Sequence, residues 1–111
     1  TQRGEGVCIT EDILSAIRVG KHVQACSILG TKASTEQLEA IAAAAGEDPI
    51  FIFLDPDDAG RNGAASLRRS LSLVSSRVQV IDAEADPKNL PDWQLRELLG
   101  LPPNHHYRVI T

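Results

Sequence analysis

The sequence predicts an α/β fold, a Rossmann-like three-layer arrangement with a central, mostly parallel sheet of about four strands and helices on both faces. Two observations lead to this prediction. Short apolar, β-branched runs alternate with segments whose apolar residues recur at helical spacing. The links between them are short, as right-handed strand–helix–strand crossovers require. A length of 111 residues fits one domain, and 42% hydrophobic residues provide enough apolar material for its core.

The first half of the chain predicts two strands and two helices. Residues 6–10 form a short apolar strand, and residues 23–29 form a second one. Between them one apolar face marks a helix that ends near Gly20, and this face consists of Ile13, Leu14, Ala16 and Ile17. Ser34 and Gln37 have the spacing of a capping box, which predicts the start of the next helix. Its buried stripe comprises Leu38, Ile41, Ala42 and Ala45, and Gly46 ends it.

The second half continues the alternation. Residues 50–54 are apolar without alternation, which is typical of a central strand covered on both faces. A helix follows, with its apolar stripe at Leu67, Leu71 and Val74. Residues 78–81 form the fourth strand, and Asp92 is expected to cap a last short helix that carries Leu95, Leu98 and Leu99. Residues 101–111 are expected to be a tail or linker.

Composition excludes several classes of protein. The formal net charge of −4 argues against a generally basic nucleic-acid wrap, although contact through bound cations or a local basic patch stays open. The apolar runs are too short to cross a bilayer, and nothing marks secretion. Two cysteines, Cys8 and Cys26, fall within predicted strands, so they are expected to be buried thiols in a reduced, intracellular compartment. The histidines lack the spacing of a zinc site.

Acidic residues follow two of the predicted strands. Glu11 comes after the first strand, and Asp55 and Asp57 come after the third. If these strands are neighbours, the carboxylates converge, because the carboxyl ends of parallel strands meet at one end of the sheet. Converging carboxylates repel one another, and a divalent cation such as Mg²⁺ or Mn²⁺ relieves that repulsion. Gly60 allows a tight turn into the following helix.

Two segments carry a family resemblance: ITEDILSAIRVG, residues 9–20, and FIFLDPDDAGRNGA, residues 51–64. Together they resemble the TOPRIM domain, the catalytic fold shared by primases, topoisomerases and certain nucleases. The family has a glutamate at the end of strand one and an Asp-x-Asp at the end of strand three. Glu11 matches the glutamate, and Asp55 and Asp57 match the paired aspartates. The DPDDAGR run is most similar to the primase part of bacteriophage and bacterial primase–helicases. The resemblance implies that residues 1–111 are a single TOPRIM domain.

The resemblance implies nucleotidyl transfer during RNA primer synthesis on single-stranded DNA. Asp55 and Asp57 hold Mg²⁺ or Mn²⁺ in this interpretation, and Glu11 holds a second cation or assists deprotonation of the attacking 3′-hydroxyl. Asp86, in the loop after strand four, is expected to support a second metal. Four basic residues are candidates to contact the phosphates of nucleoside triphosphates or template: Lys32, Arg61, Arg68 and Arg69.

The same resemblance sets the expected context. A zinc-binding template reader and a helicase motor are expected on other domains or subunits, because neither motif lies in this chain. We therefore expect the chain to be a piece excised from a larger protein and to have weak or no activity alone. The expected location is the cytoplasm of a bacterial or phage-infected cell. The chain also departs from the family pattern: Asp12 and Ser15 stand where the family commonly has Gly and Asp. Glu5 and Gly6 form a competing Glu-Gly pair, but this pair precedes its strand.

Other interpretations stay open at this stage. Asp55 and Asp57 are also residues that turns and helix N-caps favour. Glu11, Asp12 and Asp55 resemble the acids of a phospho-accepting receiver module, although no Ser or Thr follows strand four directly. A metal-dependent nuclease is also compatible with the acids alone. A topoisomerase needs a nucleophilic tyrosine, and Tyr107 lies outside the acidic constellation.

Overall fold

The structure, a computed structural model, describes residues 5–103. Its four strands are all parallel and form one sheet in the order β2-β1-β3-β4. The strands are β1 (Val7–Thr10), β2 (Gln24–Ser27), β3 (Ile50–Phe53) and β4 (Val78–Val80). Each lies within a strand predicted from the sequence and is somewhat shorter than predicted. The two strands that carry the acidic residues, β1 and β3, are neighbours in the sheet.

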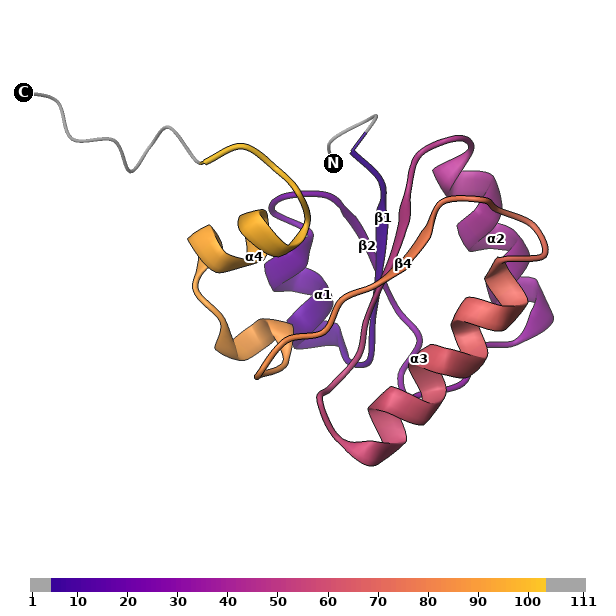
Figure 1. The fold of residues 1–111 in the computed structure, drawn as a ribbon, viewed down its shortest axis with the longest axis horizontal. Coiled ribbons are helices and arrows are strands. Elements are labelled where there is room, and N and C mark those ends of the chain that lie inside the picture. The colour runs from indigo at the N-terminus through magenta and orange to yellow at the C-terminus, as the bar shows by residue number, and fades with distance from the viewer. Residues whose placement is uncertain (1–4, 104–111) are drawn as a thin grey trace, which may run out of the picture.

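Helices cover both faces of this sheet. They are α1 (Ile13–Val19), α2 (Thr35–Ala45), α3 (Asp58–Leu71) and α4 (Asp92–Leu98), and a 3₁₀ helix, η1 (Pro87–Asn89), precedes α4. Figure 1 shows α1 and α4 on one side of the sheet and α2 and α3 on the other. The predicted three-layer fold is therefore confirmed. Within residues 5–103, no helix combines the length and hydropathy that a membrane span requires.

The side chains of β1 and β3 alternate between two apolar layers. One layer lies under α2 and α3 and contains Val7, Ile9, Ile50 and Ile52. The other lies under α1 and α4 and contains Cys8, Phe51 and Phe53. Because both faces of β3 are covered, its residues are all buried, which explains its unbroken apolar sequence. Cys8 is a free, buried thiol, as predicted, and its burial raises its pKa.

The predicted capping box begins α2. The side-chain oxygen of Ser34 accepts a hydrogen bond from the backbone N–H of Gln37 at 3.1 Å. The Gln37 side chain accepts one from the backbone N–H of Ser34 at 2.8 Å. At the other end, Gly46 is the C-cap residue with φ 58°, a conformation that glycine adopts at little cost. Local chemistry alone therefore determines both ends of α2.

The predicted apolar face of α1 is wrong. Ile13, Leu14 and Ile17 are 57%, 63% and 60% exposed. Ser15 and Val19 are the buried residues of the helix. Apolar spacing identifies a stripe on a helix, but it does not show which stripe meets the rest of the molecule.

Two further predictions fail at helix ends. Val74 lies beyond α3, which ends at Leu71, and it is 63% exposed. Asp92 does not cap α4: Pro91 is the N-cap residue and makes no side-chain cap, while Asp92 occupies the first turn. In the predicted tail, Leu101 packs against the layer under α1 and α4. Residues 104–111 lie outside the described part of the chain.

Candidate functional site

The carboxyl ends of β1 and β3 lie side by side, which places the acids that follow them together. Thr10 of β1 is in register with Phe53 of β3. Glu11 and Asp55 follow these two residues closely, so both emerge at the same end of the sheet. Glu5, the competing glutamate, precedes β1 and therefore belongs to the opposite end. The topology thus favours Glu11 over Glu5 as a site residue.

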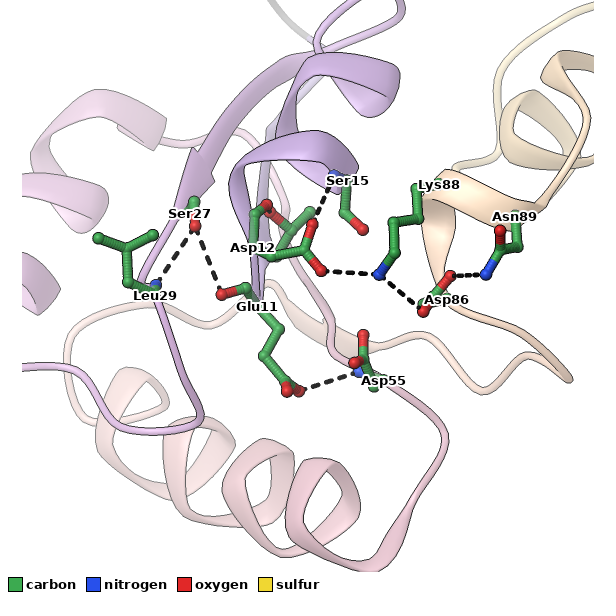
Figure 2. Close-up of polar contacts among 10 residues, drawn as sticks. Glu11, Asp12, Ser15, Ser27, Leu29, Asp55, Asp86, Lys88 and Asn89 are labelled. Carbon is green, nitrogen blue, oxygen red and sulfur yellow. Dashed lines mark hydrogen bonds and ion pairs between the residues drawn. The ribbon is translucent and has the colours of Figure 1, made fainter.

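Glu11 is held by backbone contacts and reaches toward the end of β3. Its carbonyl oxygen accepts a hydrogen bond from the N–H of Gly30 at 2.9 Å and another from the Ser27 hydroxyl at 3.4 Å. Its Oε1 accepts a hydrogen bond from the backbone N–H of Asp55 at 3.2 Å. Figure 2 shows the Glu11 side chain directed at Asp55. The first strand's acid therefore points at the aspartate motif of the third strand.

Asp55 is an acid whose negative charge is only partly compensated, because burial and the neighbouring acids raise its pKa more than Lys88 lowers it. Its Oδ1 is buried and accepts no hydrogen bond from the described residues, 5–103. Burial raises the pKa of Asp55 to about 6, and the negative charges of Glu11 and Asp86 add to this rise. A buried carboxylate oxygen without a donor is costly, because ionisation in this place is opposed by both desolvation and repulsion.

Asp57 has a different structural role. It is the N-cap residue of α3, and its Oδ1 accepts a hydrogen bond from the Gly60 backbone N–H at 2.7 Å. Gly60 itself is packed against the preceding turn: a Cβ there would overlap the carbonyl oxygen of Asp55 and crowd the Asp57 carboxylate. The turn that joins Asp55 to Asp57 therefore requires glycine at position 60.

Gly63 is a positioning residue that the sequence did not reveal. A Cβ at this position would lie 2.7 Å from both Cβ and O of Thr31, in the segment after β2. The absence of a side chain thus lets α3 approach that segment closely. The DPDDAGRNGA run contains Gly63, but only the three-dimensional contact shows why a glycine stands there.

A second pair of acids, Asp12 and Asp86, is bridged by Lys88. The Lys88 ammonium donates to Asp12 Oδ2 at 2.9 Å and to Asp86 Oδ2 at 3.0 Å. The remaining oxygens are also engaged: Ser15 N–H donates to Asp12 Oδ1 at 2.8 Å, and Asn89 Nδ2 donates to Asp86 Oδ1 at 2.7 Å. Figure 2 shows Lys88 between the two carboxylates. No motif or spacing in the sequence indicates a role for Lys88.

These contacts shift the pKa values of Asp12 and Lys88. The backbone N–H of Ser15 is the main cause that lowers the pKa of Asp12, and Lys88 adds to that effect. Hydrogen bonds to Asp12 and Asp86 raise the pKa of Lys88. Each of these shifts favours the charged form. The network is therefore an ion-paired cluster at neutral pH.

The basic residues expected to contact phosphates lie in two places. Arg61, Arg68 and Arg69 line a cavity of about 750 Å³ beside Asp55, between α3 and the end of β4. All three are exposed, and Arg61 also lies 3.6 Å from Asp58 on the same helix. Lys32 is exposed in the segment before α2 and lies outside that cavity. The structure thus brings three of the four cations to one side of the acidic site.

The residues present fit a divalent cation held by few protein ligands. Among residues 5–103, no three Asp, Glu, His or Cys side chains are grouped closely enough to hold a metal ion by themselves. Mg²⁺ does not require such a cage, because it binds through one or two carboxylates and completes its shell with water and phosphate oxygens. Glu11 and Asp55 provide two adjacent carboxylates, and the orphaned Oδ1 of Asp55 is an oxygen that a cation would satisfy.

Comparisons with known proteins identify the class of fold and the family. A family model described as Toprim-like matches residues 8–93, so this chain belongs to the Toprim-like family. A solved structure described as a small TOPRIM domain protein from Bacillus stearothermophilus is similar in fold, with a TM-score of 0.62 and 23% identity. That match covers 89% of each chain. A search of curated proteins finds no significant match.

The family match distinguishes a TOPRIM domain from a receiver module, which the topology alone does not. Acids at the carboxyl ends of neighbouring parallel strands suit both a receiver module and a TOPRIM domain. The Toprim-like assignment covers β1 through η1, and thus includes Glu11, Asp55, Asp57 and Asp86. TOPRIM domains bind divalent metal and occur in primases, nucleases and topoisomerases. The receiver interpretation therefore loses its basis.

Proposed function

We propose that this chain is the metal-dependent nucleotidyl-transfer domain of a DNA primase, which makes RNA primers on single-stranded DNA. The observation that carries the proposal is the orphaned Asp55 carboxylate beside Glu11. The DPDDAGR run, which resembles the primase form of the motif, favours a primase over other TOPRIM enzymes. Both features lie at the carboxyl ends of β1 and β3, where ligands of such sheets gather.

Glu11 and Asp55 are the residues that would hold Mg²⁺ or Mn²⁺. Asp57 holds the start of α3 and leaves its second carboxylate oxygen as a further ligand or as an acceptor for bound water. Asp86 is drawn into the Lys88 ion pair, so we assign it an indirect role. A bound divalent cation supplies electrostatic stabilisation of the charge that develops during phosphoryl transfer.

The arginines of α3 would bind and orient the substrate phosphates. Arg61, Arg68 and Arg69 line the cavity that also includes Asp55, so phosphates there would lie beside the acids. Guanidinium groups form paired hydrogen bonds with phosphate, which fixes its orientation. Three positive charges also offset the net negative charge of the chain locally. Nucleoside triphosphates and a single-stranded DNA template are the partners that this arrangement suits.

The wider context belongs to the same proposal. A primase of this kind works with a zinc-binding template reader and a helicase motor, which we place on other domains or subunits. Its site of action would be the cytoplasm of a bacterial or phage-infected cell. We expect residues 1–111 alone to prime weakly or not at all, because template reading depends on those other parts.

The first test is cation binding by the chain, followed through its backbone amide resonances. Mg²⁺ titration is expected to shift the amides of residues 11 and 55–60. The double substitution Asp55→Asn with Asp57→Asn should abolish this response and preserve the fold, because Asn is also a good N-cap. Asp48→Asn is the matched control, since Asp48 precedes β3 at the other end of the sheet. An unchanged response in the double variant would remove the site.

The second test separates primase from nuclease. The complete natural protein is given single-stranded DNA, nucleoside triphosphates and Mg²⁺, with and without Glu11→Gln. New RNA chains that disappear with Glu11→Gln would support the primase. Degradation of the DNA that depends on Glu11, with no RNA made, would show a nuclease instead.

A further inference from the structure

Lys88 is a cation placed between two acids that would otherwise attract metal. Asp12 follows β1 and Asp86 lies at the start of η1, 2.9 Å and 3.0 Å from the Lys88 ammonium. The ammonium therefore joins segments at opposite ends of the domain sequence, 76 residues apart between Asp12 and Lys88. Asp86 is the most buried of the three side chains, at 15% exposure.

Electrostatics make this cation relevant to the neighbouring pair. Burial and the negative charges of Glu11, Asp86 and Asp12 raise the pKa of Asp55, and the positive charge of Lys88 lowers it. Without Lys88, the Asp12–Asp86 pair would be a second place of high negative potential, in competition with Glu11 and Asp55 for a divalent ion. Lys88 neutralises part of this charge and occupies the space between the two Oδ2 atoms.

Stability alone does not account for the arrangement. The side chains of Lys88 and Asp12 are 31% and 38% exposed, and ion pairs with this exposure contribute little to folding. Both carboxylates of the pair are nevertheless fully engaged, each oxygen with its own donor. The arrangement saturates one pair of acids and leaves Asp55 next to it unsaturated.

We propose that the Lys88 ammonium closes the Asp12–Asp86 pair to divalent cations and thereby directs a single cation to Glu11 and Asp55. Lys88 is in this sense a positioning residue, one that determines where and how many cations bind. The proposal rests on the proposed function for the identity of the favoured site. It goes beyond that function by specifying the number of cations and the residue that limits it.

The test counts the Mn²⁺ ions bound per chain by electron paramagnetic resonance. We expect one ion for the natural chain and two for Lys88→Met, because the freed Oδ2 atoms then form a second site. Adding Asp86→Asn to Lys88→Met should return the count to one. Lys21→Met, at an exposed lysine after α1, is the matched control and should leave the count unchanged. Circular dichroism confirms the fold of each variant, and Lys88→Gln replaces Lys88→Met if the latter fails to fold.

The outcomes separate this inference from the proposed function. Equal counts in the natural chain and in both Lys88 variants would overturn the inference. So would a count of two in the natural chain. A natural chain that binds no Mn²⁺, with a Lys88→Met variant that binds one ion, would contradict the proposed function and, with it, the part of the inference that directs a cation to Glu11 and Asp55. Counts of one in both chains would overturn the inference alone. Loss of the ion through Asp55→Asn in the natural chain supports the proposed function independently.

Discussion

Two pairs of carboxylates lie at the same end of the sheet and differ in how their charge is balanced. In the Asp12–Asp86 pair every oxygen accepts a hydrogen bond, and Lys88 joins the two side chains. In the Glu11–Asp55 pair the backbone N–H of Asp55 donates to Glu11 Oε1 at 3.2 Å, and Asp55 Oδ1 is buried without a donor among residues 5–103. The position of these acids near strand ends in the sequence does not distinguish the two pairs. The hydrogen-bond donors to their carboxylate oxygens do.

The difference separates acids whose charge the protein itself balances from acids whose charge, on our proposal, a bound cation would balance. An acid whose pKa is lowered by donors is stabilised in its charged form by the protein itself, as Asp12 is. An acid whose pKa is raised by burial and by like charges destabilises the folded state when it ionises, as Asp55 does. Such a cost is typical of functional sites, where a ligand provides the missing compensation.

The largest expected effect comes from breaking the turn that joins Asp55 to α3. Gly60→Ala should destabilise the fold by about 3 kcal/mol or more, because the added methyl group overlaps the Asp55 carbonyl oxygen. Ser66→Ala, at an exposed position of the same helix, is the control and should change stability little. Urea denaturation measures both. A fully stable Gly60→Ala variant would show that the turn is not as tight as described.

Next in size is the removal of the charge on Asp55, which Lys88 only partly offsets. The pKa of Asp55 is raised from 3.8 to about 6, so the folded state binds the proton more tightly than the unfolded state. Stability therefore falls as pH rises from 3.8 to about 6, and stays reduced above that range. Asp55→Asn should stabilise the fold by about 1–2 kcal/mol at about pH 7, and hardly at all at about pH 4, in the absence of metal.

Asp12→Asn should change stability least, and in the direction opposite to Asp55→Asn. The pKa of Asp12 is lowered, so this acid stabilises the fold above pH 3.8, and the stabilisation is lost as pH falls through the folded-state pKa. Asp12→Asn should therefore destabilise the fold by about 0.5 kcal/mol at about pH 7, because the exposed ion pair is worth little. Urea denaturation of Asp12→Asn and Asp55→Asn at about pH 7 and at about pH 4 tests this difference in sign. The same sign for Asp12→Asn and Asp55→Asn would erase the contrast.

Local signals in the sequence predicted much of the framework. The unbroken apolar run of β3 and the capping box of α2 are local features, and both predictions are confirmed. The acids after β1 and β3 could be placed together because parallel strands fix which ends meet. The bounds of the strands were less well predicted, because a strand ends where its neighbour stops pairing.

What the sequence could not show depends on contacts between distant segments. The buried face of α1 follows from what packs against it. Arg18 donates to Leu90 O at 2.7 Å and lies 3.0 Å from Asp92, so it ties α1 to the end of η1 and to the first turn of α4. The same holds for Lys88, whose partner Asp12 is 76 residues away. No periodicity or motif encodes such a pairing, so the compensated pair was visible only in three dimensions.

The most direct test follows the side-chain carboxyl carbon of Asp55 by ¹³C NMR during a pH titration, with and without Mg²⁺. We expect a pKa of about 6 for Asp55 in the absence of metal, and a clear fall of that value when Mg²⁺ is added. The Asp12 carboxyl, held by its own donors, should titrate at the same low pH in both conditions. An Asp55 pKa near 3.8 that Mg²⁺ leaves unchanged would contradict the assignment of Glu11 and Asp55 as a cation site.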